Sequence, residues 1–224
     1  MPTVTLQPAE TKGIDTFVLD GSTNDRSTGE GMRVGWTSSP KEARALVEFD
    51  LTTVLAKTLR AREISSVTLT LNHKSDQNFS SAHTKDLSIQ VLNGSFSESA
   101  TWVYRDGSSE SWTTAGGDVL VAPGTVTTTY TGDSNLVITS TTPTAGNLLY
   151  QVHDAIKNRA FKYRFLVKME SGSPYRYVNF WSSSAGSESD RPKLDITYSR
   201  KRILTPMRSY STKPSNMRRP RSSK

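Results

Sequence analysis

The chain has 224 residues, enough for one domain with a sizeable core, and carries 28 lysines and arginines against 21 aspartates and glutamates. It has no cysteine, which excludes disulfide frameworks, thiol catalysis and zinc sites built on thiolates. The charge is segregated, because residues 199–224 hold nine basic residues and no acidic one, whereas residues 1–198 hold 19 basic and 21 acidic residues. The sequence therefore describes a slightly acidic domain with a cationic tail, not a uniformly basic nucleic-acid-binding domain.

The sequence does not show the features of a membrane span or of a secretory signal peptide. No stretch approaches the roughly 20 consecutive apolar residues of a membrane span. The first ten residues, MPTVTLQPAE, have neither a basic region nor an apolar region, so we expect no secretory signal peptide there.

Alternation of apolar and polar residues predicts about ten short strands in chain order. The first five lie in DTFVL (15–19), GMRVGWT (31–37), RALVEFDL (44–51), ISSVTLTLN (64–72) and DLSIQVLN (86–93). The other five lie in TVTTTYT (125–131), NLVITST (135–141), YRFLVKME (163–170), YVNFWSS (177–183) and KLDITYS (193–199). Two short helices are also predicted, one near residues 54–59 and one in LYQVHDAIKN (149–158), whose apolar residues recur at helical spacing.

Short strands separated by Gly, Ser, Asn and Asp turns predict an all-β fold, a jelly-roll-like antiparallel β-sandwich with one or two short helices. The apolar alternation stops after Tyr198. We therefore expect a β-sandwich domain over residues 1–198 and an extended C-terminal tail over residues 199–224.

Several stretches carry a family resemblance as an ordered series. RALVEFDL followed by ISSVTLTLN forms a strand pair, SESATWVY (97–104) contains Glu98, Thr101 and Trp102, and WTTAGGD (112–118) contains a Gly-Gly-Asp turn. YQVHDAIKN (150–158) and the closing FWSSSAGSESDRPKLDITY (180–198) complete the series. In order and spacing, most of residues 10–198 resembles the DNRLRE-type carbohydrate-binding-module family. That resemblance implies a β-sandwich that contacts polysaccharide or serves as a structural unit.

The tryptophans have two interpretations, since an indole ring can stack on the apolar face of a sugar or fill the core of a sandwich. Trp102 and Trp181 lie within strand-like runs, which favours the core. Trp112 lies in a Ser-rich loop before two glycines, and Trp36 lies beside Gly35 at a strand end. We therefore expect any glycan contact to use exposed rings at Trp36 and Trp112.

The acidic side chains are weaker candidates for a catalytic or metal-binding site. Glu48 and Asp50 lie two residues apart on one strand, a spacing that suits an acid/base pair or calcium ligands but favours a solvated strand face. Sandwich binding modules often hold a structural calcium, for which Asp20 and Asp25 in LDGSTNDRS are the best candidates. We expect no cofactor other than this candidate calcium.

The sequence gives little indication of a catalytic site. His73, His83 and His153 are scattered without metal-ligand spacing, and no nucleophile elbow or phosphate-binding loop occurs. The sequence thus predicts a binding or structural protein, not an enzyme.

The basic tail is interrupted by Pro206, Pro214 and Pro220, which favour an extended conformation. It has too few apolar residues to fold alone, so we expect it to dock into an acidic groove or a sheet edge of a partner protein. A disordered solubilising tail and a nucleic-acid-binding strip are the alternatives. The expected docking residues are Arg200, Lys201, Arg202, Ile203, Leu204, Met207, Arg208, Tyr210, Met217, Arg218, Arg219 and Arg221.

A cysteine-free sandwich with a docking tail and no signal peptide is typical of a virion structural protein. The resemblance implies the same, because bacteriophage virions reuse carbohydrate-module-like sandwiches. We expect a capsid decoration or head-fibre component, made in the host cytoplasm and assembled in many copies with other virion proteins, without membrane contact. The alternatives are a secreted, extracellular polysaccharide-binding module and an appendage of an enzyme.

Overall fold

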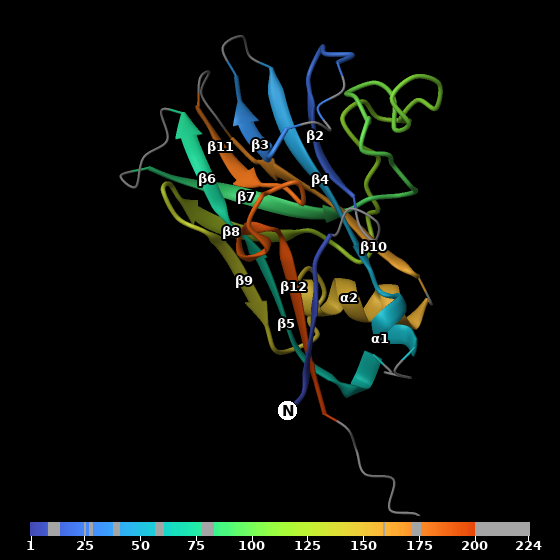
Figure 1. Cartoon of the computed structure of the whole chain (residues 1–224). Coiled ribbons are helices and arrows are strands. Elements are labelled where there is room, and N and C mark those ends of the chain that lie inside the picture. Colours follow the sequence, from blue (N-terminus) through green and yellow to red (C-terminus); the bar gives the residue numbers. More distant parts are fainter. Residues whose placement is uncertain are drawn as a thin grey trace, which may run out of the picture.

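The computed structural model describes residues 1–8, 14–24, 26, 29–37, 41–56, 61–77, 83–158, 160–171 and 176–199. Over these residues the chain forms two antiparallel sheets that curl around one core (Figure 1). The smaller sheet has the order β1 (Thr3–Leu6), β12 (Lys193–Tyr198), β5 (Ile64–Leu71) and β9 (Leu136–Ser140). The predicted all-β antiparallel architecture is confirmed.

The larger sheet runs in the order β6 (His73–Gln77), β11 (Arg176–Trp181), β3 (Gly31–Trp36), β4 (Glu42–Asp50), β10 (Lys162–Met169), β7 (Thr84–Val91) and β8 (Val126–Thr131). Strand β2 (Asp15–Leu19) pairs with β4 beside this path. All ten predicted strands are present. Strands β1 and β6 were not predicted, because β1 is only four residues long and β6, HKSDQ, lacks apolar alternation.

Both predicted helices form, as α1 (Thr52–Ala56) and α2 (Leu148–Lys157), and residues 57–59 of the first prediction lie outside the described part. Asn147 caps α2, since its Oδ1 accepts a hydrogen bond from the Tyr150 backbone N–H at 2.9 Å. The helix packs its apolar face, with Val152 and Ile156, against β5, β9 and β10. Two 3₁₀ turns lie at Ala61–Glu63 and Glu188–Asp190. Neither helix of the described residues has the length and apolarity needed to cross a bilayer.

The main core lies between the sheets and contains clustered aromatic rings. Phe165 stacks near Phe49 and Tyr163, with ring centroids 6.0 and 5.2 Å apart, and Tyr130 meets Phe180 edge-on at 5.6 Å. Such aromatic pairs add to the free energy gained from burying apolar area. This core holds the two sheets together and fixes which side chains of β3, β4 and β11 face outward.

A second, smaller core lies on the outer face of the larger sheet, where residues 93–120 cross over β4 and β10 (green in Figure 1). Phe96, Ala100 and Trp112 of this segment pack on Leu46 and Leu166 of the sheet. Strand β4 is therefore buried on both faces in its middle, a pattern that alternation alone does not predict.

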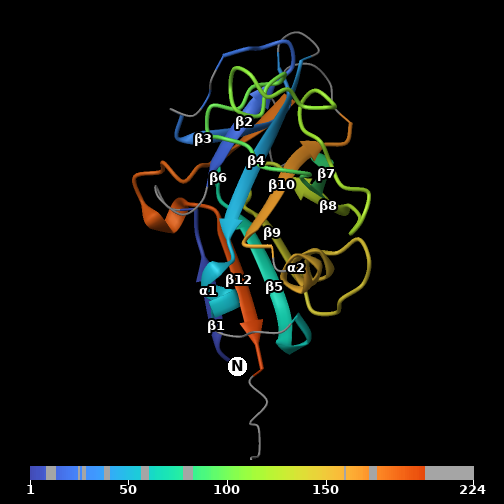
Figure 2. The same cartoon turned by 90° about the vertical axis from the view of Figure 1, so that its right-hand side faces the viewer.

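The start of the chain and the end of β12 lie together at one end of the sandwich, where the Tyr198 N–H donates to the Pro2 carbonyl at 3.1 Å. Strands β2, β3 and β6 lie toward the opposite end in both views (Figures 1 and 2). Residues 200–224 lie outside the described part, so the boundary predicted at residue 198 stays a prediction.

Candidate functional site

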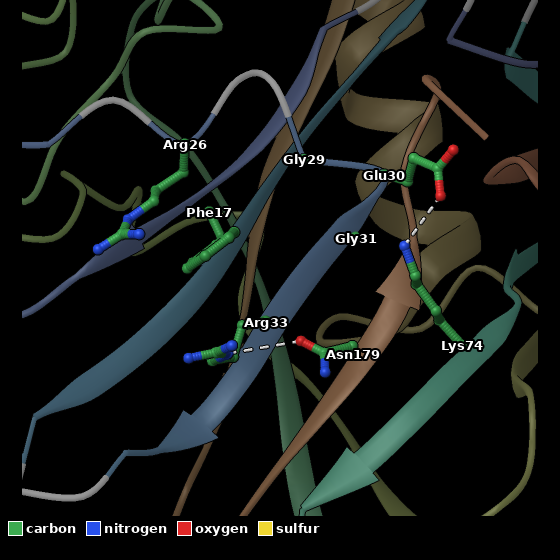
Figure 3. A pocket seen from close by; sticks show the side chains of 8 residues that line it. All are labelled: Phe17, Arg26, Gly29, Glu30, Gly31, Arg33, Lys74 and Asn179. Atoms are coloured by element: carbon green, nitrogen blue, oxygen red, sulfur yellow. Dashed lines mark hydrogen bonds and ion pairs between the residues drawn. The ribbon is translucent and has the colours of Figure 1, made fainter.

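A hollow of about 380 Å³ opens on the outer face of β3 and β11, and we call it the arginine pocket (Figure 3). Its lining comes from β2, the β2–β3 connection, β3, β6 and β11. The lining residues are Phe17, Arg26, Gly29, Glu30, Gly31, Arg33, Lys74 and Asn179.

Strand alternation places the polar residues of β3 and β11 in the pocket. Met32 and Val34 of β3 are fully buried in the core, so Arg33 between them projects to the outer face. Asn179 lies directly opposite Arg33 on β11, and the Arg33 Nε donates to its Oδ1 at 3.5 Å. The polar wall of the pocket thus follows from the register of these two strands.

Arg33 is held between two aromatic rings. Its guanidinium carbon lies 4.1 Å from the ring centroid of Tyr177 and 5.6 Å from that of Phe17. Arg26 approaches the same Phe17 ring at 5.8 Å. Cation–π contacts of this kind orient a guanidinium without neutralising its charge.

The third cation of the pocket, Lys74, forms an ion pair with a neighbouring carboxylate. Its Nζ lies 3.3 Å from the Glu30 Oε2 and 4.3 Å from the centroid of the Trp181 ring. By contrast, Arg26 and Arg33 have no carboxylate partner among the described residues. The described part of the pocket therefore carries two uncompensated positive charges.

The floor of the pocket is fixed by the end of β11. Ser182 donates from its Oγ to the Gly29 carbonyl at 3.1 Å and from its backbone N–H to the Glu30 carbonyl at 3.0 Å. Gly31 leaves space at the floor of the pocket, since a Cβ there would come within 3.2 Å of the Lys74 Cδ. The pocket is thus shaped by contacts within the protein itself.

The expectation of an exposed ring at Trp112 is wrong. The side chain is only 5% exposed, belongs to the second core, and donates from Nε1 to the Thr101 carbonyl at 3.0 Å. The Ser-rich loop that suggested exposure instead folds back over the sheet. Trp112 cannot stack on a sugar without unfolding of this segment.

The other three tryptophans are half-buried. Trp36 packs against the main core at the end of β3, and its Nε1 has no hydrogen-bond partner among the described residues. Trp102 packs against the second core under the Arg44 guanidinium, 4.7 Å from the ring centroid, and the Trp181 ring lies under Lys74. A glycan contact at Trp36 stays a prediction.

The solvated strand face predicted around Glu48 is also wrong. Glu48 is only 3% exposed and accepts from the Arg164 Nε at 2.6 Å, with the Lys162 Nζ at 3.3 Å. Lys162 also reaches Asp50 at 3.4 Å. Partial desolvation acts to raise the pKa of Asp50, but hydrogen bonds from Thr52 and Lys162 bring it below its ordinary value. These carboxylates serve cross-strand ion pairing between β4 and β10.

Sequence reasoning missed Asp15, which is 5% exposed. Its carboxylate accepts from the Ser183 N–H at 2.7 Å and from the Ser183 Oγ at 2.8 Å. Burial raises the pKa of Asp15 to about 6, although the bonds from Ser183 act in the opposite direction. Asp15 thus joins β2 to the segment after β11.

The metal prediction is only partly covered by the structure. Asp20 lies at the end of β2, where its N–H donates to the Glu42 carbonyl at 2.8 Å, whereas Asp25 lies outside the described residues. Among the described residues, no three His, Asp or Glu side chains gather as a metal site. The calcium at Asp20 and Asp25 stays a prediction, as do the docking roles of residues 200–224, which also lie outside the described part.

In comparisons with known proteins, no family model matches the chain and no curated protein matches it. The likeness to carbohydrate-binding modules therefore rests on the sequence motifs given above.

Proposed function

We propose that this protein is a non-enzymatic structural component of a virion, a β-sandwich held in the particle by its basic tail. The observation that carries the proposal is the segregation of charge, with nine basic residues and no acidic one after residue 198. Strand β12 ends at Tyr198, at the end of the sandwich opposite β2, β3 and β6 (Figure 2). A partner bound there would leave the arginine pocket accessible.

The roles of the buried acids support the proposal that the protein is not an enzyme. Glu48 is paired with Arg164 and Lys162, and Asp15 is held by Ser183. A general acid or base needs an accessible position beside a substrate. Both groups are instead engaged within the fold.

A secreted polysaccharide-binding module is the second candidate, favoured by the motif series shared with carbohydrate-binding modules. Gene context separates the two, because neighbouring capsid and portal genes support the virion and an upstream signal sequence supports secretion.

The anchor is tested by deleting residues 200–224 in the virus and measuring the amount of the protein in purified particles. We expect a folded, soluble protein that no longer enters particles. Raising salt should weaken docking of the intact protein without abolishing it, because the apolar residues of the tail still contribute.

Two results would contradict the anchor. One is incorporation of the shortened protein at the normal copy number. The other is binding of the isolated tail to bulk DNA with complete loss at moderate salt, which points to phosphate neutralisation instead.

A further inference from the structure

The arginine pocket holds more positive charge than the acidic side chains of the described residues neutralise. Arg26 and Arg33 approach the same Phe17 ring at 5.8 and 5.6 Å, and neither has an acidic partner among the described residues. Two like charges in one hollow repel each other, and the repulsion is relieved when an anion lies between them. The arrangement therefore suits a ligand with negative charge.

In Figure 3, Arg26 and Arg33 extend to the same side of the hollow with the Phe17 ring between them, whereas the Lys74 ammonium points to the Glu30 carboxylate. Arg26 comes from the β2–β3 connection, Arg33 from β3 and Lys74 from β6, on the far side of the hollow. A carboxylate presents two oxygens in one plane, whereas a phosphate or sulfate presents three or four in a tetrahedron. Guanidinium groups form paired hydrogen bonds with such oxyanions.

The pocket is also organised in advance of binding. Arg33 is fixed by Tyr177, Phe17 and Asn179, and Ser182 fixes the glycine floor. Pre-positioned donors lose little conformational freedom on binding, which improves affinity. A volume of about 380 Å³ accommodates a small group with part of the molecule that carries it.

We infer that the arginine pocket binds a tetrahedral oxyanion, the phosphate or sulfate group of a monoester, with Arg26 and Arg33 as its ligands. This inference goes beyond the proposed virion role and does not depend on it. The same chemistry is offered by the free anions and by an anionic polymer at a cell surface.

The test titrates the full-length protein with inorganic phosphate, inorganic sulfate, glucose 6-phosphate and acetate at constant ionic strength. Binding is followed by calorimetry and by the amide signals of Gly29 and Gly31 in ¹H–¹⁵N spectra. We expect saturable binding of phosphate and sulfate with shifts at both glycines. Tighter binding of glucose 6-phosphate than of inorganic phosphate indicates an ester, and equal binding indicates the free anion.

The matched variants separate the pocket from net charge. R26Q/R33Q should weaken phosphate binding at least about tenfold, since it removes two charged donors. R218Q/R219Q removes the same charge from the tail and should leave the affinity unchanged. If R26Q/R33Q does not fold, R26K/R33K, which keeps the charge but loses the planar donor pairs, should also weaken binding.

Three results would overturn the inference. They are a lack of saturable phosphate and sulfate binding, equal affinity for acetate, and equal losses of affinity in R26Q/R33Q and R218Q/R219Q. The last result would mean that only the overall charge of the chain attracts the anions.

Discussion

At the scale of single residues, Asp15 affects the stability of the fold in two opposite ways. Its two hydrogen bonds from Ser183 join segments 168 positions apart, yet its carboxylate is withdrawn from water. Desolvation disfavours the charged form, which is why its pKa rises from 3.8 to about 6. Ionisation of Asp15 therefore destabilises the fold at neutral pH.

Asp15→Asn is predicted to remove this pH dependence. Because the folded pKa lies above the unfolded one, the folded protein binds the proton more tightly, and the stability that Asp15 contributes at low pH is lost as pH rises toward 6. An asparagine can accept from the Ser183 N–H and donate to its Oγ at every pH. Urea unfolding should show that the variant gains roughly 2 to 3 kcal/mol relative to the natural protein between about pH 4 and about pH 7.

Parallel stability profiles of the two proteins over this range would contradict the prediction. They would mean that Asp15 ionises in the folded protein as readily as in the unfolded chain.

At the scale of elements, alternation located the strands, because a strand with one buried face repeats every second residue. It did not reveal that β4 is covered on its outer face, since that depends on residues 93–120 folding back. The prediction that the Trp112 ring is exposed was wrong for the same reason. Serines and paired glycines around it indicate a loop, and only the tertiary fold shows that this loop is buried against Leu46 and Leu166.

Trp112→Ala is predicted to lower the free energy of unfolding by about 3 to 5 kcal/mol, as large truncations in a core do. The change leaves a cavity over Leu46 and removes the hydrogen bond to the Thr101 carbonyl. Phe161→Ala is the control, because Phe161 is 62% exposed, and it should change stability by less than about 1 kcal/mol. Equal losses in chemical denaturation of the two variants would show that the second core contributes nothing.

The arginine pocket could be predicted only in part from the sequence. Arg33 and Asn179 lie at outward positions of predicted strands, but nothing in the sequence shows that β3 pairs with β11 in the register that joins them. Lys74 lies on a strand that alternation missed. Arg26 lies between strands, where spacing carries no signal. Convergence of distant residues is a property of the tertiary fold.

At the scale of the whole molecule, β12 is the last strand of the described part and ends at Tyr198. Every buried apolar residue of the described part lies at or before this position, and Ser199 donates its N–H to the Glu63 carbonyl at 2.8 Å. The residues that follow it are rich in basic side chains and show no apolar alternation in the sequence. Domain stability and tail function are therefore expected to be separable.

A chain ending at Ser199 is predicted to unfold cooperatively, with a thermal midpoint within a few degrees of that of the full chain. A chain ending at Pro192 is the control and should not fold, because it lacks β12, whose Leu194 and Ile196 are fully buried. Circular dichroism melts of the three chains provide the comparison. Loss of cooperative unfolding on removal of residues 200–224 would show that the tail is part of the core.

The position of β12 also governs when the protein can fold during its synthesis. β12 lies between β1 and β5, with Thr3 paired to Thr197 across 194 positions of the chain. On the ribosome, β1 remains without β12, its neighbour among the described strands, until almost the whole domain has been translated. Contacts this distant in sequence slow folding and prolong the exposure of unpaired strand edges. The smaller sheet can therefore be completed only after β12 has been synthesised, because β12 lies between β1 and β5.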